Sequence, residues 1–429
     1  MADPLQDYAD APVPDGATVH GLQIAMVITG IGTTLPMFAL GTQIAAAQGL
    51  KMTLAVAFLA CGLVTLLNIF TAVVGARCRL STYQILAFSF GTRGTQLVNM
   101  MLAFMLLGWF ATTADMLGSA VQQAIAAMYG LIGPRWLYTL VMMLLMTLTG
   151  IFGFRVMERF VRVTVPALIA LMGYVVWLSA SRGGLASALT HSGDHTLSTV
   201  DALSSVIGAI ILTAVLAPDL TRYTRNDRNA LISVLGVAVG FPAALILAAI
   251  PAAIYGARDL MSVMALLQIP GIAIMVLVIS TWTSNTANLY SATLTLATLF
   301  KRTSPRTLGL WGALVALAAA LGGIADHFIP LLIVLGVISA PLAGVYAVDF
   351  FALHGGRPYG AGEMNALPAF RGSAVLAWGL GSAVGLVETY CGHTLTKIPA
   401  VDSILATVIG HLLMNRSLLR LRRQRAVHT

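Results

Sequence analysis

Two polar runs inside otherwise apolar segments are the features of this sequence best suited to binding a small solute. The first reads WFATTAD at 109–115 and the second WTSNTAN at 282–288, 173 residues later. Trp, Thr and Ala recur at the first, fifth and sixth positions, and Asp115 falls opposite Asn288. Hydroxyl and amide groups can bind a polar solute or a cation, or they can join neighbouring membrane helices by hydrogen bonds.

Within these runs, three positions suggest particular chemistry. Trp109 is suited to stacking on a flat heteroaromatic ring, although packing is the alternative. Asp115 lies inside an apolar segment, where an ionised carboxylate is costly, so it is a candidate for ion or proton coupling. A protonated packing role, or pairing with a polar group of a neighbouring helix, remains open for it. The run from Thr283 to Asn288 supplies hydroxyl oxygens suited to sodium and amides that donate and accept hydrogen bonds, Asn285 among them.

Glycine and proline interrupt two further segments. The first apolar segment contains TGIGTTLP at 29–36, and the sixth has Gly208 at mid-depth and Pro218 near its inner end. Such matched interruptions predict discontinuous helices one and six, whose unwound carbonyls and helix ends can bind a cation and a solute. Close packing or a simple kink is the alternative for each.

The elements that must position these residues are transmembrane helices. The chain is 58% hydrophobic and 9% charged, against about 25% charged in soluble domains. Its apolar runs are long enough to cross a hydrocarbon core about 30 Å thick. We therefore predict an all-α integral membrane protein with twelve transmembrane helices, near 21–47, 52–75, 97–129, 136–153, 161–181, 200–221, 230–256, 264–299, 308–323, 328–351, 372–390 and 399–414.

The distribution of basic residues gives these helices a direction. With the N-terminus inside, 19 of the 24 Lys and Arg residues fall in inner loops or the C-terminal tail. This bias follows the positive-inside rule and predicts a bacterial-type inner membrane protein with both termini in the cytoplasm. Because these residues follow the helix ends rather than forming one patch, no nucleic-acid partner is expected.

Matched breaks in helices one and six also predict an inverted five-plus-five repeat. We expect a cytoplasmic N-terminal tail at 1–20, a first repeat at 21–181, a second at 200–351, two further helices within 372–414 and a basic cytoplasmic tail at 415–429. The sequence contains no HExxH, phosphate-binding loop or nucleophile elbow, which argues against an enzyme. No cofactor or obligate protein partner is expected beside the lipid bilayer.

The sequence resembles the nucleobase-cation symporter-1 family, and within it the bacterial cytosine permease branch. The resemblance spans nearly the whole chain and rests on PVP at 12–14, SFG at 89–91, GWF at 108–110, PDLTRY at 218–223 and WTSN at 282–285. It implies an inverted-repeat fold with helices one and six unwound. It also implies import of nucleobases or related rings with sodium or protons.

The resemblance further implies roles for individual residues. Trp109 would stack on the ring, and Thr113, one turn further along, would bind the substrate where the hydantoin transporter has a glutamine. Asn288 would lie close to that transporter's substrate-binding asparagine. Thr283 and Ser284 would bind sodium through hydroxyl oxygens. Carbonyls near Gly30 and Thr33 would complete that oxygen shell.

The sixth helix departs from the cytosine permease pattern. Where those proteins have Gly-Ser-Phe, this chain has Gly208-Ala209-Ile210, which lacks a hydroxyl and a second aromatic ring. Isoleucine still offers an apolar wall to a ring face, but the lost hydroxyl favours another pyrimidine or a pyrimidine precursor. We therefore predict cation symport of a nucleobase-like heterocycle, with sodium as the coupling ion. The alternatives are a proton-coupled permease for a precursor such as hydroxymethylpyrimidine and, from another class, a membrane channel.

Overall fold

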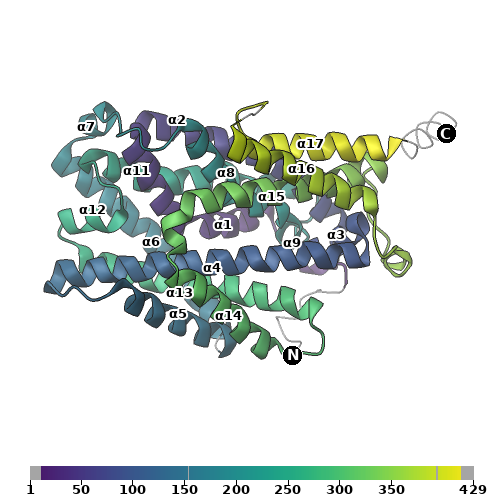
Figure 1. The fold of residues 1–429 in the computed structure, drawn as a ribbon, viewed down its shortest axis with the longest axis horizontal. Helices are drawn as coiled ribbons and strands as arrows, with labels where there is room; N and C mark the ends of the chain where they lie inside the picture. The colour runs from purple at the N-terminus through teal and green to yellow at the C-terminus, as the bar shows by residue number, and fades with distance from the viewer. Residues whose placement is uncertain (1–10, 153, 393–394, 417–429) are drawn as a thin grey trace.

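The computed structural model describes residues 11–152, 154–392 and 395–416, and its architecture is helical (Figure 1). In chain order the α-helices are α1 (Gly21–Gly32), α2 (Leu35–Cys78), α3 (Thr82–Phe90), α4 (Thr92–Tyr129), α5 (Arg135–Phe152), α6 (Phe154–Gly183), α7 (Leu185–Thr190), α8 (Thr199–Val215), α9 (Ala217–Thr221), α10 (Asp227–Ser233), α11 (Phe241–Tyr255), α12 (Leu260–Leu266), α13 (Pro270–Leu299), α14 (Pro305–Leu321), α15 (Phe328–Val348), α16 (Gly372–Cys391) and α17 (Pro399–Met414). The 3-10 helices are η1 (Asp15–Ala17), η3 (Ile324–His327) and η5 (Ala361–Ala366), and the π-helices are η2 (Gly236–Gly240) and η4 (Asp349–Leu353).

Twelve apolar spans can be traced through the described residues. Seven helical stretches are long and apolar enough to cross a membrane, and five shorter apolar helices join them. The 44-residue α2 serves two spans because Gly49, at φ 73°, redirects the chain between them. The first part of α2 completes the span begun by α1. The prediction of about twelve transmembrane helices is therefore confirmed, and the chain is a multi-pass membrane protein.

The predicted interruption of the first span lies between α1 and α2. Thr33 (φ −88°, ψ 75°) and Thr34 (φ −138°, ψ 159°) leave the helical region. Pro36 is the second residue of α2, a position at which proline is tolerated because the first N–H groups of a helix have no intrahelical acceptor. The break follows directly from the TGIGTTLP sequence.

The sixth span is interrupted at Leu216, between α8 and α9 (φ −96°, ψ 10°). Pro218 lies in the first turn of α9, so the predicted discontinuity is present at that end. Gly208, by contrast, is helical and lies inside α8. A Cβ atom at Gly208 would overlap the carbonyl oxygen of Leu332, so this glycine permits close packing of α8 on α15.

The long helices run side by side along the long axis of the molecule (Figure 1). α7 and α12 lie at one end of the bundle, α3 and α9 lie at the other, and α16 and α17 form one edge. The most extensive contacts join α2 to α11, α4 to α13, α8 to α15 and α16 to α17. In the predicted five-plus-five order, the second span corresponds to the seventh and the third to the eighth. α2 contains the second span and α11 the seventh, and α4 and α13 are the third and eighth, so both pairs of counterparts are in contact.

Short helices between the spans were not predicted from hydropathy. α3 begins with a capping box, in which Ser81 and Gln84 satisfy each other's backbone N–H groups. Asp259 caps α12 by accepting a hydrogen bond from the N–H of Ser262 at 2.8 Å. These helices are too short to span a membrane, so they serve as connections at the ends of the bundle.

Candidate functional site

Trp109 lies in the middle of α4 and is half-buried. Its ring centroid is 6.3 Å from that of Phe328, the first residue of α15, with the ring planes tilted by 54°. This spacing is within the range of favourable aromatic pairs. The partly exposed indole of Trp109 therefore packs against the start of α15.

Thr113, one helical turn after Trp109, has an unsatisfied hydroxyl. Its side chain is 3% exposed, and its Oγ1 has no hydrogen-bond partner among the described residues. The adjacent Thr112 differs, because its hydroxyl donates to the carbonyl of Gly108 at 2.8 Å. A buried hydroxyl without a partner is costly, so Thr113 is the residue of this run best placed to gain from a polar ligand.

The two asparagines of α13 form a connected pair. The amide of Asn285 donates to the carbonyl of Phe110 at 2.9 Å and lies 3.4 Å from the sulfur of Met146. The amide of Asn288 donates to Oδ1 of Asn285 at 3.0 Å. Asn285 is fully buried and Asn288 is half-buried. Asn285 thus joins α13 to α4, while the carbonyl oxygen of Asn288 remains the more accessible group for a solute.

Ser284 faces a partly open environment on α13. It is half-buried, and its hydroxyl donates to the carbonyls of Ser280 at 3.0 Å and Thr281 at 3.3 Å. Its oxygen lone pairs remain able to accept or to bind a cation. The side chain of Thr283 lies outside the described residues, so its predicted contact with sodium remains a prediction.

The predicted sodium ligands of the first span lie at the α1 break. The hydroxyl of Thr33 donates to the carbonyl of Thr29 at 2.8 Å, and its backbone N–H donates to the carbonyl of Gly30 at 3.2 Å. α1 packs chiefly on η2 and α10, whereas α13 packs chiefly on α4 and α6. The two halves of the predicted sodium site are therefore held by different neighbouring helices.

The α8 residues predicted to face the solute occupy different environments. Gly208 packs against α15, as described above, and Ile210 is fully buried in the apolar core. Ala209 between them is half-buried. Of the three, Ala209 is the one with part of its surface open.

Asp115 belongs to an ion-pair network. Its side chain is 2% exposed, and its carboxylate lies 2.7 Å from the guanidinium of Arg135, at the start of α5. It also accepts from the hydroxyl of Thr139 at 3.2 Å and from the N–H of Ala325 at 3.3 Å. Arg135 reaches Asp326 of η3 at 2.9 Å as well. Of the readings open for Asp115, this geometry corresponds to pairing with a neighbouring helix.

Comparison with known proteins identifies the family. Residues 12–360 match the family model described as "Permease for cytosine/purines, uracil, thiamine, allantoin". The chain belongs to this permease family. It is accordingly a transporter and not an enzyme, and the sequence resemblance to the nucleobase-cation symporter-1 family is confirmed.

Individual relatives agree with the family over nearly the whole chain. Cytosine permeases of Escherichia coli strain K12 and of Escherichia coli O157:H7 are each 28% identical over 415 residues, covering 95% of this chain and 94% of theirs. The inward-facing conformation of Mhp1 superposes with a TM-score of 0.82 at 17% identity, covering 99% of this chain and 95% of that chain.

A second Mhp1 structure and a further symporter show the same fold. Mhp1, a nucleobase-cation-symport-1 family transporter, in a closed conformation with bromovinylhydantoin bound, gives a TM-score of 0.79 at 16% identity, with 98% and 96% of the two chains covered. A Na⁺-coupled sialic acid symporter gives 0.66 at 14% identity, with 95% and 91% covered. The predicted inverted-repeat transporter fold is thereby confirmed.

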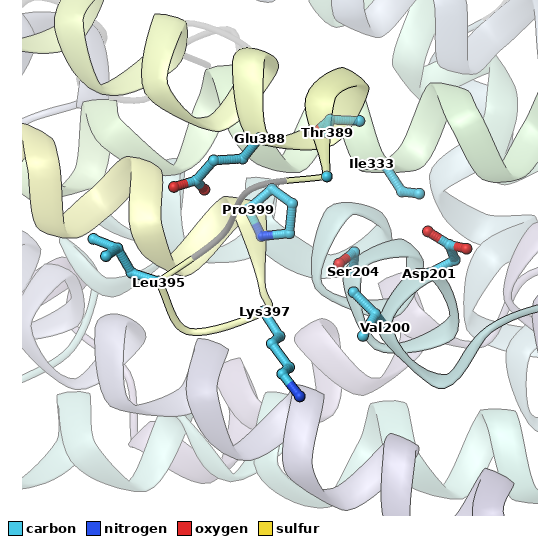
Figure 2. A pocket seen from close by; sticks show the side chains of 10 residues that line it. Val200, Asp201, Ser204, Ile333, Glu388, Thr389, Leu395, Lys397 and Pro399 are labelled. Atoms are coloured by element: carbon cyan, nitrogen blue, oxygen red, sulfur yellow. The ribbon is translucent and has the colours of Figure 1, made fainter.

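A large cavity of the permease lies between the first turns of α8 and the connection from α16 to α17. Its volume is about 710 Å³, and Figure 2 shows Asp201 and Ser204 of α8 on one side and Glu388 of α16 on the other. Ser204 is one turn before Gly208 and has a buried hydroxyl without a partner among the described residues. The cavity is thus bounded by α8, α16 and α17, and Trp109 is not among its lining residues.

Sequence reasoning did not single out two contacts of the permease site. Phe328 pairs with Trp109, but one phenylalanine in an apolar segment carries no local signal. The indole N–H of Trp282 donates to the hydroxyl of Thr149 at 2.7 Å, which joins α13 to α5. The WTSN motif had directed attention to its hydroxyls, whereas its tryptophan is held by a helix of the other predicted repeat.

Proposed function

We propose that this permease imports a nucleobase or a related flat nitrogen heterocycle by cation symport, with sodium as the coupling ion. The observation that carries the proposal is the family match over residues 12–360. The Mhp1 structure with bromovinylhydantoin bound and the Na⁺-coupled sialic acid symporter share its fold. A flat heterocycle and a sodium ion are therefore the solute and ion that the relatives favour.

The proposed solute site is formed by α4, α8 and α13. Trp109 supplies a ring face for stacking, and Thr113 supplies the buried hydroxyl that lacks a partner among the described residues. Ala209 and Ile210 provide an apolar wall, and Gly208 brings α8 close to α15. Asn288 is the amide proposed to reach the ring edge, held in place by Asn285.

The proposed sodium site would lie between α13 and the α1 break. Ser284 and Thr283 would supply hydroxyl oxygens, and Gly30 and Thr33 would supply oxygens at the break. Residues held by separate neighbours fit a site that is completed when the helices move together, as alternating access requires. Binding of the ion would then favour the arrangement that captures the ring.

The cytosine permease relatives suggest cytosine or another pyrimidine as the solute. The Gly208-Ala209-Ile210 sequence favours a pyrimidine or precursor with fewer polar edge contacts on that side. Proton coupling through Asp115 is the weaker alternative, because its carboxylate is held by Arg135 at 2.7 Å.

We further propose that both termini face the cytoplasm of a bacterial-type inner membrane, and that residues 21–181 and 200–351 form the two inverted repeats. The distribution of basic residues supports this orientation of the termini. The repeat boundaries are supported by the two helix breaks and by the α2–α11 and α4–α13 pairs. Most of the basic tail at 415–429 lies outside the described residues.

Uptake into proteoliposomes tests the proposal. Purified protein would be reconstituted and supplied with labelled cytosine, uracil, adenine or hydroxymethylpyrimidine, with and without an inward sodium gradient. We expect saturable uptake of at least one of these rings that increases with the sodium gradient. Uptake that follows a proton gradient alone would replace sodium by protons, and the absence of saturable uptake of every ring would refute the proposal.

A further inference from the structure

A second cavity, of about 550 Å³, lies where η4 meets α3, α17 and the segment before α16. It is formed by residues that the transport proposal does not use. Its polar lining includes Asp349, Tyr359, Arg371, Ser373, His411 and Asn415. Two of these side chains are more than nine-tenths buried and carry an oxygen without a partner.

Asp349 is the deeper of the two. Asp349 is 5% exposed, and its Oδ1 lies 2.7 Å from Nε2 of His411. Its other oxygen, Oδ2, is buried and has no hydrogen-bond partner among the described residues. A buried carboxylate oxygen of this kind normally receives a hydrogen bond or a cation.

His411 is part of a chain of contacts with two further polar side chains of the cavity. The amide nitrogen of Asn415 donates to the carbonyl of His411 at 2.8 Å and lies 3.5 Å from Nδ1 of the ring. The amide oxygen of Asn415 in turn faces the hydroxyl of Ser373 at 3.5 Å. The His411 ring thus lies between Asp349 and Asn415, with Nε2 beside Oδ1 of Asp349. This contact engages one carboxylate oxygen and leaves Oδ2 to be satisfied by another group.

Tyr359 supplies the second unpartnered oxygen. The residue is 8% exposed, and its hydroxyl has no partner among the described residues. Burial, together with the nearby Asp349 charge, raises the pKa of Tyr359, so the phenol stays protonated and neutral. Its ring stacks on Phe88 with centroids 4.1 Å apart and lies 4.9 Å from the ring of His354. An aromatic surface therefore adjoins the Asp349 carboxylate.

We propose that Asp349 and Tyr359 anchor a binding site for a small organic ammonium ion. Such an ion carries N–H donors that can bond both Oδ2 of Asp349 and the oxygen of Tyr359, the two buried oxygens that lack a partner among the described residues. The aromatic rings favour an organic cation, whereas a hard divalent metal ion takes about six or more oxygen ligands. Arg371 is exposed at the same cavity, and the ion-pair partner of Asp349 in the described chain is His411.

This site is distinct from the proposed transport site. Asp349 follows the last residue of α15, whereas Phe328, which faces Trp109, is the first residue of that helix. With a rise of about 1.5 Å per residue, the intervening helix separates the two by roughly 30 Å. Ammonium binding and ring uptake can accordingly be measured independently.

Equilibrium dialysis with labelled butylammonium tests the proposal on the full-length protein in detergent. We expect saturable binding that unlabelled butylammonium displaces and that 1-butanol, its neutral analogue, does not. Asp349→Asn should weaken binding at least tenfold. Glu388→Gln is the matched control, because Glu388 is a buried carboxylate at the other cavity and has an oxygen without a partner among the described residues. The affinity of this variant for butylammonium should match that of the wild type.

Three outcomes would overturn the proposal. One is the absence of saturable binding, and another is equal affinity in the wild type and Asp349→Asn. The third is displacement by sodium chloride as effective as displacement by butylammonium at equal concentration, which would assign the site to an inorganic cation. If Asp349→Asn does not fold, Tyr359→Phe decides, since it removes only the phenol oxygen; we expect its affinity to fall several-fold, and an unchanged affinity would refute the assignment.

Discussion

Asp115 and Arg135 join the middle of α4 to the first residue of α5 through a contact of 2.7 Å, in which the carboxylate is buried and the guanidinium is one-third exposed. Because Arg135 also reaches Asp326 at 2.9 Å, the same guanidinium connects both helices to η3, which precedes α15. The network therefore fixes the start of the helix whose first residue faces Trp109.

We expect Arg135→Gln to destabilise the permease by about 3 kcal/mol, because it leaves the carboxylate of Asp115 buried without its partner. The double variant Asp115→Asn with Arg135→Gln should be less destabilised than Arg135→Gln alone, since no buried charge remains. Thermal unfolding of the wild type, the two single variants and the double variant in one detergent gives a double-mutant cycle for this pair. Additive losses would mean that the two side chains do not act as a pair.

The hydrogen bond from Asn285 to the carbonyl of Phe110 leads to a second prediction. Asn285→Ala should destabilise the protein by about 0.6–1.7 kcal/mol, the range of hydrogen bonds between membrane helices. Asn288→Ala should destabilise the protein less, because Asn288 is half-buried and donates its hydrogen bond to Asn285 on the same helix. Melting temperatures of both variants provide the measurement. A larger loss of stability from Asn288→Ala than from Asn285→Ala would contradict the assignment of Asn285 as the residue that joins α13 to α4.

Hydropathy was sufficient to predict the spans, and Gly and Pro were sufficient to predict the breaks, because both depend on local residue types. The break at Thr33 and Thr34 lies within the TGIGTTLP run, and that at Leu216 lies two residues before Pro218. Gly208 shows where this reasoning ends. A glycine that admits a neighbouring helix and one that ends a helix look alike in the sequence.

The contacts of the site could not be read from the sequence, because they depend on how separate helices face one another. Thr112 and Thr113 are adjacent and chemically identical, yet one hydroxyl bonds its own helix and the other has no partner among the described residues. The partner of Asp115, Arg135, likewise lies at the start of the next helix, 20 residues further along the chain. Side-chain direction decides each case, and hydropathy carries no information about it.

Close packing of α8 on α15 makes Gly208 a sensitive position. Gly208→Ala places a methyl group against the carbonyl oxygen of Leu332, so we expect a loss of about 1–3 kcal/mol from overpacking. Gly379→Ala in α16 is the control, because a Cβ there has no atom within 4 Å, and it should be neutral or slightly stabilising. Thermal unfolding distinguishes the two, and equal stability of both variants would contradict the packing assignment.

Ser284 offers a test of the proposed ion site that is separate from the ring site. Ser284→Ala removes a hydroxyl oxygen from α13, so we expect about a tenfold higher sodium concentration for half-maximal uptake. Uptake at saturating sodium should stay near that of the wild type. Thr295→Ala is the control, because Thr295 is likewise a half-buried residue of α13 whose hydroxyl bonds its own helix, at 2.8 Å, and it is not part of the proposed ion site. A Ser284→Ala protein with unchanged sodium dependence would remove Ser284 from the ion site.

Trp109 is the residue on which the proposed ring recognition depends most. Stacking of a base on an aromatic side chain contributes about 1–3 kcal/mol, as judged by alanine substitution. Trp109→Ala should therefore weaken ring binding by about tenfold or more, measured as the half-saturation concentration for the transported ring at saturating sodium. Trp109→Phe keeps a ring face and should recover part of that affinity. Trp311→Ala is the matched control, because Trp311 is 64% exposed on the outer face of α14, and it should leave uptake unchanged. If Trp109→Ala and Trp311→Ala have equal effects, stacking on Trp109 does not contribute to recognition, and the solute must be held by the hydroxyl and amide groups of α4 and α13.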